Sequence, residues 1–211
     1  MIEKISKKIL DILVDENETN EQKEILLFGI TRIVEDVPKY LFVFIVSLFF
    51  HILPQVGVVL LITILYKVLV GGAHARTNTE CFIFTSLYFF IPVIIGKFVN
   101  VPVIYLYIVS ALIFIYSLYV IYKHVPADTE EIPILNKGKR KKYKIYAIVS
   151  IVFIYISTLV LTRFNEQYAR IVISTVFLID FFTSNFMYKI LRCKHSYESD
   201  EFKEYYNENK E

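Results

Sequence analysis

The feature that most constrains this chain is a series of long apolar segments separated by short polar breaks. The segments extend over about 38–53, 56–70, 82–98, 103–122, 145–161 and 170–191. A helix needs about 20 mostly apolar residues to cross a bilayer, and these runs approach or reach that length. Because 55% of the 211 residues are hydrophobic, a soluble domain is excluded. We predict an all-α polytopic membrane protein of about six transmembrane helices, some of them short or re-entrant.

The ends of the chain are more polar than its middle. Residues 1–15 place isoleucines at helical spacing between lysines, which predicts an amphipathic helix, and a second helical run follows up to Pro38. We therefore expect one membrane domain over 1–211. It comprises N-terminal amphipathic helices over 1–37, a transmembrane bundle over 38–191, and a charged, frayed cytoplasmic tail over 192–211.

Basic residues predict the orientation of the bundle. Six of them crowd a polar loop that we place at 123–144: Lys137, Lys139, Arg140, Lys141, Lys142 and Lys144. Loops rich in lysine and arginine stay on the cytoplasmic side. With six spans, the N-terminus, the polar break at 71–81 and the C-terminal tail share that side, where a free thiol survives.

The break at 71–81 holds the residues most suggestive of chemistry. His74 and Cys81 are seven positions apart, and an imidazole can take the proton of a thiol so that the thiolate attacks a carbonyl. On an unbroken helix these side chains would be roughly 10 Å apart, whereas a base needs a contact of ~3 Å. A working pair therefore requires a turn, for which Gly71 and Gly72 supply flexible backbone.

The start of the following helix matters equally. Asn78 suits an N-cap, and Cys81 would then lie in the first turn, where free N–H groups favour a thiolate and an oxyanion. The alternative is a solvated loop in which the histidine and the cysteine are incidental.

Two charged residues interrupt the apolar runs. Lys67 lies four residues before Gly71 and either snorkels to the headgroups or contacts substrate. Asp180 needs an inward partner, for which Thr183, Asn185, a tyrosine or Lys67 are available.

Several other classes of site are not supported. No metal-binding spacing of histidines and cysteines, no serine elbow and no phosphate-binding loop occurs, so we expect no metal and no cofactor. His124 and His195 are scattered near the membrane interfaces, and Cys193 is expected to be inert. Nothing indicates a nucleic-acid partner.

The chain resembles the accessory gene regulator protein B (AgrB) family of Gram-positive quorum-sensing systems. The residues that carry the resemblance are Gly71-Gly72-Ala73-His74-Ala75 with Cys81, the basic Lys67, and Pro126-Ala127-Asp128-Thr129 with Pro133. One departure is Ile132, where the family pattern has lysine. Hydropathy order and length fit over nearly the whole chain.

The resemblance implies a function and a set of roles. It implies a multi-pass cysteine endopeptidase of the bacterial cell membrane that cleaves an AgrD-like propeptide at the cytoplasmic side. Cys81 would be the nucleophile and His74 the base, giving an acyl-enzyme thioester that cyclises to a thiolactone. Residues expected to bind the substrate are Lys67, Gly71, Gly72, Asp128, Lys139, Arg140, Lys141 and Lys142. Partners would be the propeptide, the lipid bilayer and, as one option, a second copy in a homodimer. A small transporter or channel, or a scaffold without catalysis, remains the alternative.

Overall fold

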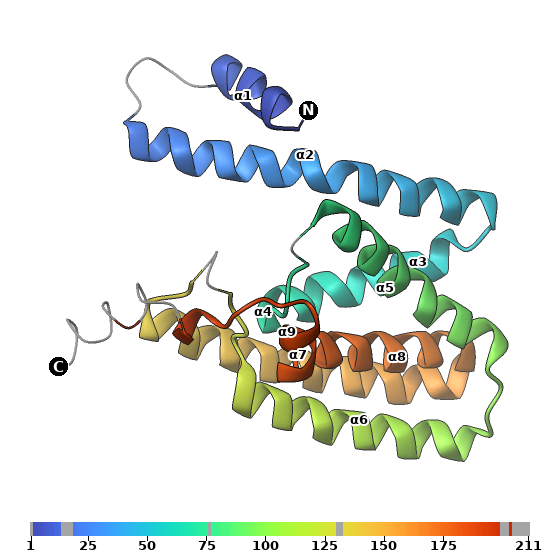
Figure 1. Cartoon of the computed structure of the whole chain (residues 1–211). Coiled ribbons are helices and arrows are strands. Elements are labelled where there is room, and N and C mark those ends of the chain that lie inside the picture. The colour runs from blue at the N-terminus through green and yellow to red at the C-terminus, as the bar shows by residue number, and fades with distance from the viewer. Residues whose placement is uncertain (1, 14–18, 76, 130–132, 199–202, 204–211) are drawn as a thin grey trace. The chain divides into compact units, whose positions relative to one another are not determined.

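The computed structural model describes residues 2–13, 19–75, 77–129, 133–198 and 203. Most of the described residues are helical. The β-pairing among them is limited to isolated bridges. The chain forms two compact units, residues 1–51 and residues 52–211. Figure 1 traces both units.

The first unit consists of α1 (Ile2–Leu13) and α2 (Asn20–Phe49), which pack on each other. A capping box starts α2: Thr19 Oγ1 accepts from the Gln22 N–H at 3.3 Å, and Gln22 Oε1 accepts from the Thr19 N–H at 2.9 Å. We expected a break at Pro38, and this is wrong, because α2 continues through it. A proline removes one helical hydrogen bond, while the neighbouring Lys39–Asp36 pair, at 2.7 Å, bridges the same turn.

The second unit is a helical bundle built around α8. Its helices are α3 (Leu53–Ile62), the π-helical turn η1 (Thr63–Lys67), α4 (Val68–Val70), α5 (Asn78–Phe98), α6 (Val103–His124), α7 (Lys137–Phe164), α8 (Glu166–Thr183) and α9 (Asn185–Ile190). The central α8 packs against α3, α5, α6 and α7. Hydroxyls on this buried helix bond its own carbonyls, as in Thr175 Oγ1 to Ile171 O at 2.7 Å, so small polar residues allow close packing.

Among the described residues, four helical segments are long and apolar enough to cross a membrane: Leu53–Val70, Asn78–Phe98, Val103–His124 and Lys137–Phe164. The other two predicted spans, 38–53 and 170–191, fall short for different reasons. The apolar part of α2 after Pro38 ends with the helix at Phe49, and α8 includes Glu166, Arg170 and Asp180 among its 18 residues. The structure therefore supports an all-helical membrane protein with four candidate spans among its described residues.

Two boundaries differ from the sequence-based prediction. The basic run at 137–144 is helical and begins α7, because Asn136 accepts from the Lys139 N–H at 3.0 Å and lysine and arginine favour helix. The predicted span at 170–191 is divided at Ser184, whose extended backbone ends α8 and begins α9.

The first part of the C-terminal tail is packed, so the prediction of a frayed tail is wrong for residues 192–198. His195 forms an isolated bridge with Thr129, and its ring stacks on Tyr188 at 3.7 Å between centroids. A short 3₁₀ turn follows at Ser196–Glu198. Beyond residue 198 only Lys203 is described, and Ile132 also lies outside the described residues.

Candidate active site

The polar break between α4 and α5 is a non-helical loop with a fixed path as far as His74. The Gly71 N–H bonds Lys67 O at 2.8 Å, and the Gly72 N–H bonds Ala127 O at 2.8 Å. The Ala73 N–H donates to Phe182 O at 3.0 Å, a carbonyl in the last turn of α8. Such carbonyls have no partner within their own helix, so the end of α8 is a natural receptor for this loop.

Gly71 and Gly72 are needed for close approach more than for flexibility. Their φ angles are +82° and +134°, which favour glycine. A Cβ on Gly71 would collide with the Ala127 carbonyl, and one on Gly72 would lie 3.2 Å from Phe182 O. The two glycines therefore allow the loop backbone to pack closely against Ala127 and against Phe182 at the end of α8.

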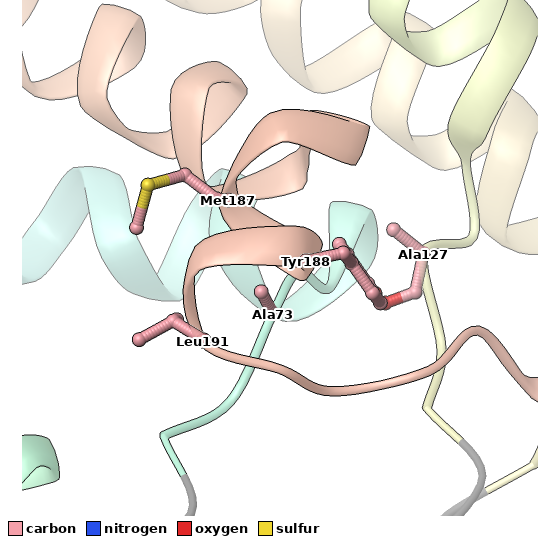
Figure 2. Packing of buried hydrophobic residues seen from close by; sticks show 5 residues of the cluster. All are labelled: Ala73, Ala127, Met187, Tyr188 and Leu191. Atoms are coloured by element: carbon pink, nitrogen blue, oxygen red, sulfur yellow. The ribbon is translucent and has the colours of Figure 1, made fainter.

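An apolar cluster supports the loop from beneath. It comprises Ala73, Ala127, Met187, Tyr188 and Leu191. Figure 2 shows Met187 and Tyr188 on α9, with Leu191 directly after the helix, beside the loop at Ala73, and Tyr188 is directed toward Ala127. The Tyr188 hydroxyl donates to Ala127 O at 2.9 Å, so one carbonyl receives bonds from α9 and from the loop. The six-residue helix α9 thereby holds the loop in register.

Cys81 lies in the first turn of α5, as predicted, but the cap differs by one residue. Thr77 is the N-cap, and its hydroxyl accepts from the Glu80 N–H at 3.2 Å. The Cys81 N–H donates to Thr77 O at 2.9 Å. The N–H groups of Glu80 and Cys81 are therefore both bonded to Thr77. His74 lies in the loop and Cys81 in the helix, so the two residues are not on one unbroken helix. The His74 side chain is exposed and the Cys81 side chain is half-buried.

Lys67 points toward this loop. Its Nζ lies 5.7 Å from the ring centroid of Phe182 and 5.9 Å from that of Tyr88, within cation–π range. A Cβ on Gly72 would lie 3.5 Å from the same nitrogen. The ammonium also interacts electrostatically with Cys81. Lys67 is the last residue of the π-helical turn Thr63–Lys67, and such turns are frequent at functional sites.

Asp180 on α8 is hydrogen-bonded to the π-helical turn through Tyr66. Its carboxylate accepts from the Tyr66 hydroxyl at 2.9 Å and from the Ser117 hydroxyl at 2.5 Å. A tyrosine was among the partners that we considered, whereas Ser117 was missed because nothing in the sequence pairs α6 with α8 at that level. Of the others, Thr183 bonds its own helix at Ile179 O.

The remaining predicted binding residues fall into two groups. Asp128 and Arg140 form a largely buried ion pair at 2.8 Å, and the Ile134 N–H donates to Asp128 Oδ2 at 2.7 Å. This pair ties the start of α7 to the segment that bonds the loop. The other three predicted binding residues are exposed lysines on the first turns of α7, and we call them the outer lysines: Lys139, Lys141 and Lys142.

Sequence reasoning missed a polar pocket of about 280 Å³ where α6 ends and α7 begins. His124 and His195, which looked scattered, both line it. The available signal was the concentration of basic residues at the end of one apolar run and the start of another.

The comparisons with known proteins agree with this architecture. The family model described as accessory gene regulator B matches residues 6–184. A "Putative AgrB-like protein" of Clostridium perfringens (strain SM101 / Type A) is 29% identical over 153 residues, covering 68% of this chain and 69% of the relative. "Putative AgrB-like protein 2" of Clostridium perfringens (strain 13 / Type A) is 28% identical over 151 residues, with coverages of 68% and 69%. A "Putative AgrB-like protein" of Clostridium beijerinckii is 28% identical over 155 residues, covering 72% and 75%. No solved structure matches significantly.

Proposed function

Because this chain belongs to the accessory gene regulator B family, we propose that it is a membrane-embedded cysteine endopeptidase that cleaves a quorum-sensing propeptide. The family takes part in accessory gene regulator processing and works on a propeptide substrate. The observation that carries the proposal is the construction of the 71–81 region. A pinned loop presents His74, a capped helix presents Cys81, and the Lys67 ammonium lies between the loop and the aromatic rings beneath it.

The first chemical step is acylation of Cys81. The thiolate attacks the carbonyl carbon of the scissile peptide bond, while the nearby ammonium of Lys67 and the helix N-terminus stabilise negative charge. His74 carries the thiol proton and gives it to the leaving amine as the C–N bond breaks. The products are a thioester on Cys81 and a new amino terminus on the released fragment.

The second step closes the ring. A cysteine thiol within the acyl part attacks the thioester carbonyl, His74 accepts its proton, and the Cys81 thiolate leaves. One thioester replaces another, so little free energy is required. Hydrolysis would give a linear acid, and the apolar support under the loop helps to keep water from the thioester.

The outer lysines suit a docking role. They project from the first two turns of α7, whereas Arg140 on the same turns is held by Asp128. An acidic segment of the propeptide would be attracted to them at the cytoplasmic surface, and added salt should weaken that attraction. Charges at such a rim alter KM more than kcat.

The decisive experiment uses purified protein in lipid nanodiscs with a synthetic propeptide, scored for cleavage by mass spectrometry. Cys81→Ala and His74→Ala should each lower the rate by at least about a hundredfold, the usual scale for a general base. The matched control is Cys193→Ser, which removes the other free thiol and should cleave at the wild-type rate. Cleavage by Cys81→Ala at the rate of the control would eliminate the mechanism.

A second measurement examines Lys67. The change Lys67→Met retains most of the side-chain length and removes the charge. In a Cys193→Ser background, it should slow alkylation of Cys81 by iodoacetamide at neutral pH, because the thiolate is the reactive form. Equal alkylation rates with and without the charge would remove Lys67 from the proposed chemistry.

The transporter alternative is weakened by the contacts of Asp180. In that alternative Asp180 and Lys67 are intramembrane polar elements, but the Asp180 carboxylate accepts two hydrogen bonds within the bundle. Its burial is therefore accounted for by structure.

A further inference from the structure

The polar pocket at the junction of α6 and α7 has a composition that points to a ligand. Its lining is Tyr122, Lys123, His124, Val125, Pro126, Asp128, Arg140, Lys144, Asn185 and His195. Three cations and two imidazoles face one carboxylate. A pocket of about 280 Å³ is close to the lower end of the range for small-molecule sites, so it suits a compact polar group and excludes a folded peptide segment.

The positive charge of the pocket is not neutralised internally. Asp128 is already paired with Arg140, whose guanidinium nitrogen lies 2.8 Å from Asp128 Oδ2. The surplus charge belongs to Lys123 and Lys144, which have neutral partners. Lys144 Nζ donates to Tyr122 O at 2.5 Å, and Lys123 Nζ donates to the Tyr119 hydroxyl at 3.1 Å. An ammonium has three N–H donors, so each lysine can give further hydrogen bonds to an anion.

The pocket lies where lipid headgroups would be. It is formed by the last turn of α6 and the first turns of α7, two of the four helices able to span a membrane, and these ends adjoin in the fold (Figure 1). Tyrosines close to these helix ends are exposed: Tyr119 by 52%, Tyr122 by 79% and Tyr146 by 56%. Exposed tyrosines are typical of the headgroup level of a membrane protein.

We propose that this pocket binds the phosphate of an anionic membrane lipid, with Lys123 and Lys144 as the principal donors. A phosphate has several strong acceptor oxygens, and basic pockets between membrane helices are suited to such headgroups. The acyl chains would lie against the apolar outer surfaces of α6 and α7. Because Asp128 and Arg140 line the same pocket and also anchor the segment that bonds the Gly72 N–H, a bound lipid would brace that segment.

The test counts bound lipids by native mass spectrometry of the full chain in a neutral detergent. The probes are phosphatidylglycerol, phosphatidylcholine, oleate as an anionic lipid without phosphorus, and inorganic phosphate. We expect one phosphatidylglycerol site per chain that binds at least about tenfold more tightly than the other probes. The double change Lys123→Gln with Lys144→Gln should weaken that site by about tenfold or more, since hydrogen bonds to charged groups are worth at least that.

Three variants make the result interpretable. Lys137→Gln removes an exposed lysine from the same helix start without touching the pocket, and it should bind like wild type. Changing Lys123 and Lys144 to arginine keeps the charge and should retain the site. If the double glutamine variant fails to fold, Lys123→Gln alone, at an exposed position, should still lose several-fold affinity.

Several results would overturn the proposal. One is phosphatidylglycerol binding that is unchanged in the glutamine variants or that falls equally in Lys137→Gln. Another is phosphatidylglycerol binding no tighter than oleate, with an acidic peptide binding in a Lys123- and Lys144-dependent way, which would assign the pocket to a protein ligand. Binding of inorganic phosphate that is as tight as binding of phosphatidylglycerol would likewise contradict the proposal that the ligand is a lipid. Since Cys81→Ala should bind lipid normally, the outcome is independent of the proposed peptidase activity.

Discussion

Removing the acceptor group of Asp180 should destabilise the bundle, while exchanging it for an amide should not. Asp180→Ala leaves the Tyr66 hydroxyl without its acceptor in a fully buried position, and it leaves a small cavity. Ser117 is less affected, because its single hydroxyl proton can be donated to Ile113 O, 2.9 Å away, in place of Asp180. In Asp180→Asn the amide oxygen can still accept from Tyr66, while the amide N–H donates to the oxygen of Ser117.

These contacts set the size of the effect. One orphaned buried hydroxyl costs about 1–3 kcal/mol in soluble proteins. Hydrogen bonds between membrane helices average about 0.6 kcal/mol and reach about 1.7, since the unfolded chain in a membrane finds other partners. We therefore expect Asp180→Ala to lose about 1–3 kcal/mol. At about 2–4 °C per kcal/mol for a chain of this size, the unfolding midpoint should fall by roughly 2–12 °C. For Asp180→Asn the loss should stay below about 1 kcal/mol.

The assay is the fraction of monodisperse protein after heating in detergent, followed by propeptide cleavage on the same samples. Ser110→Ala is the control on α6, because that buried hydroxyl donates to its own helix at Tyr107 O, 2.9 Å away. The reasoning is refuted if Asp180→Asn melts as low as Asp180→Ala. It is also refuted if Asp180→Asn keeps its midpoint and loses activity, because the negative charge itself would then be in use.

Three further predictions follow from other contacts. Gly71→Ala should lower cleavage by tenfold or more, since a strained backbone costs about 1–3 kcal/mol, whereas Gly57→Ala, where a Cβ meets nothing within 4 Å, should be neutral in the same assay. Burial lowers the pKa of His195 despite the nearby carboxylates, so its packed, neutral state is fully favoured above pH 6.5 and loses stability as the pH falls below that value. Proteolysis of the tail should then increase between pH 7 and pH 5 in wild type and stay level in His195→Phe. A cysteine introduced at residue 138 should react with an impermeant label only from the cytoplasm and one at residue 165 only from outside, and the reverse pattern would invert the orientation.

Local patterns predicted those parts of the fold that local forces determine. Apolar length located the four candidate spans, and the polar break at 71–81 is a loop followed by a capped helix. The errors occurred where tertiary packing or a neighbouring cap overrides a local rule. Pro38 was expected to end a helix, and the basic residues at 137–144 were expected to form a loop, yet both lie within long helices. Extended backbone at Ser184 was equally invisible in an apolar run.

The site itself is defined by pairings across long stretches of sequence. The Gly72 N–H bonds a carbonyl 55 residues later, at Ala127, and the Ala73 N–H bonds one at Phe182. Tyr66 and Asp180 are separated by 114 positions. A motif such as Gly-Gly-Ala-His can indicate which groups take part, but it carries no information about the carbonyls that fix them.

This construction has a consequence for how the region is formed. The loop acquires its path only when the last turn of α8 and the short helix α9 are in place, because Phe182 O and Tyr188 supply the bonds that hold Ala73 and Ala127. Those elements are made after every other helix of the bundle. A chain that has inserted α3 to α7 therefore has His74 and Cys81, and the bond from Gly72 to Ala127, but lacks the bonds from Phe182 O and Tyr188. Within the proposed mechanism, the thiol becomes competent only in the completed bundle, which keeps a reactive cysteine from acting during insertion.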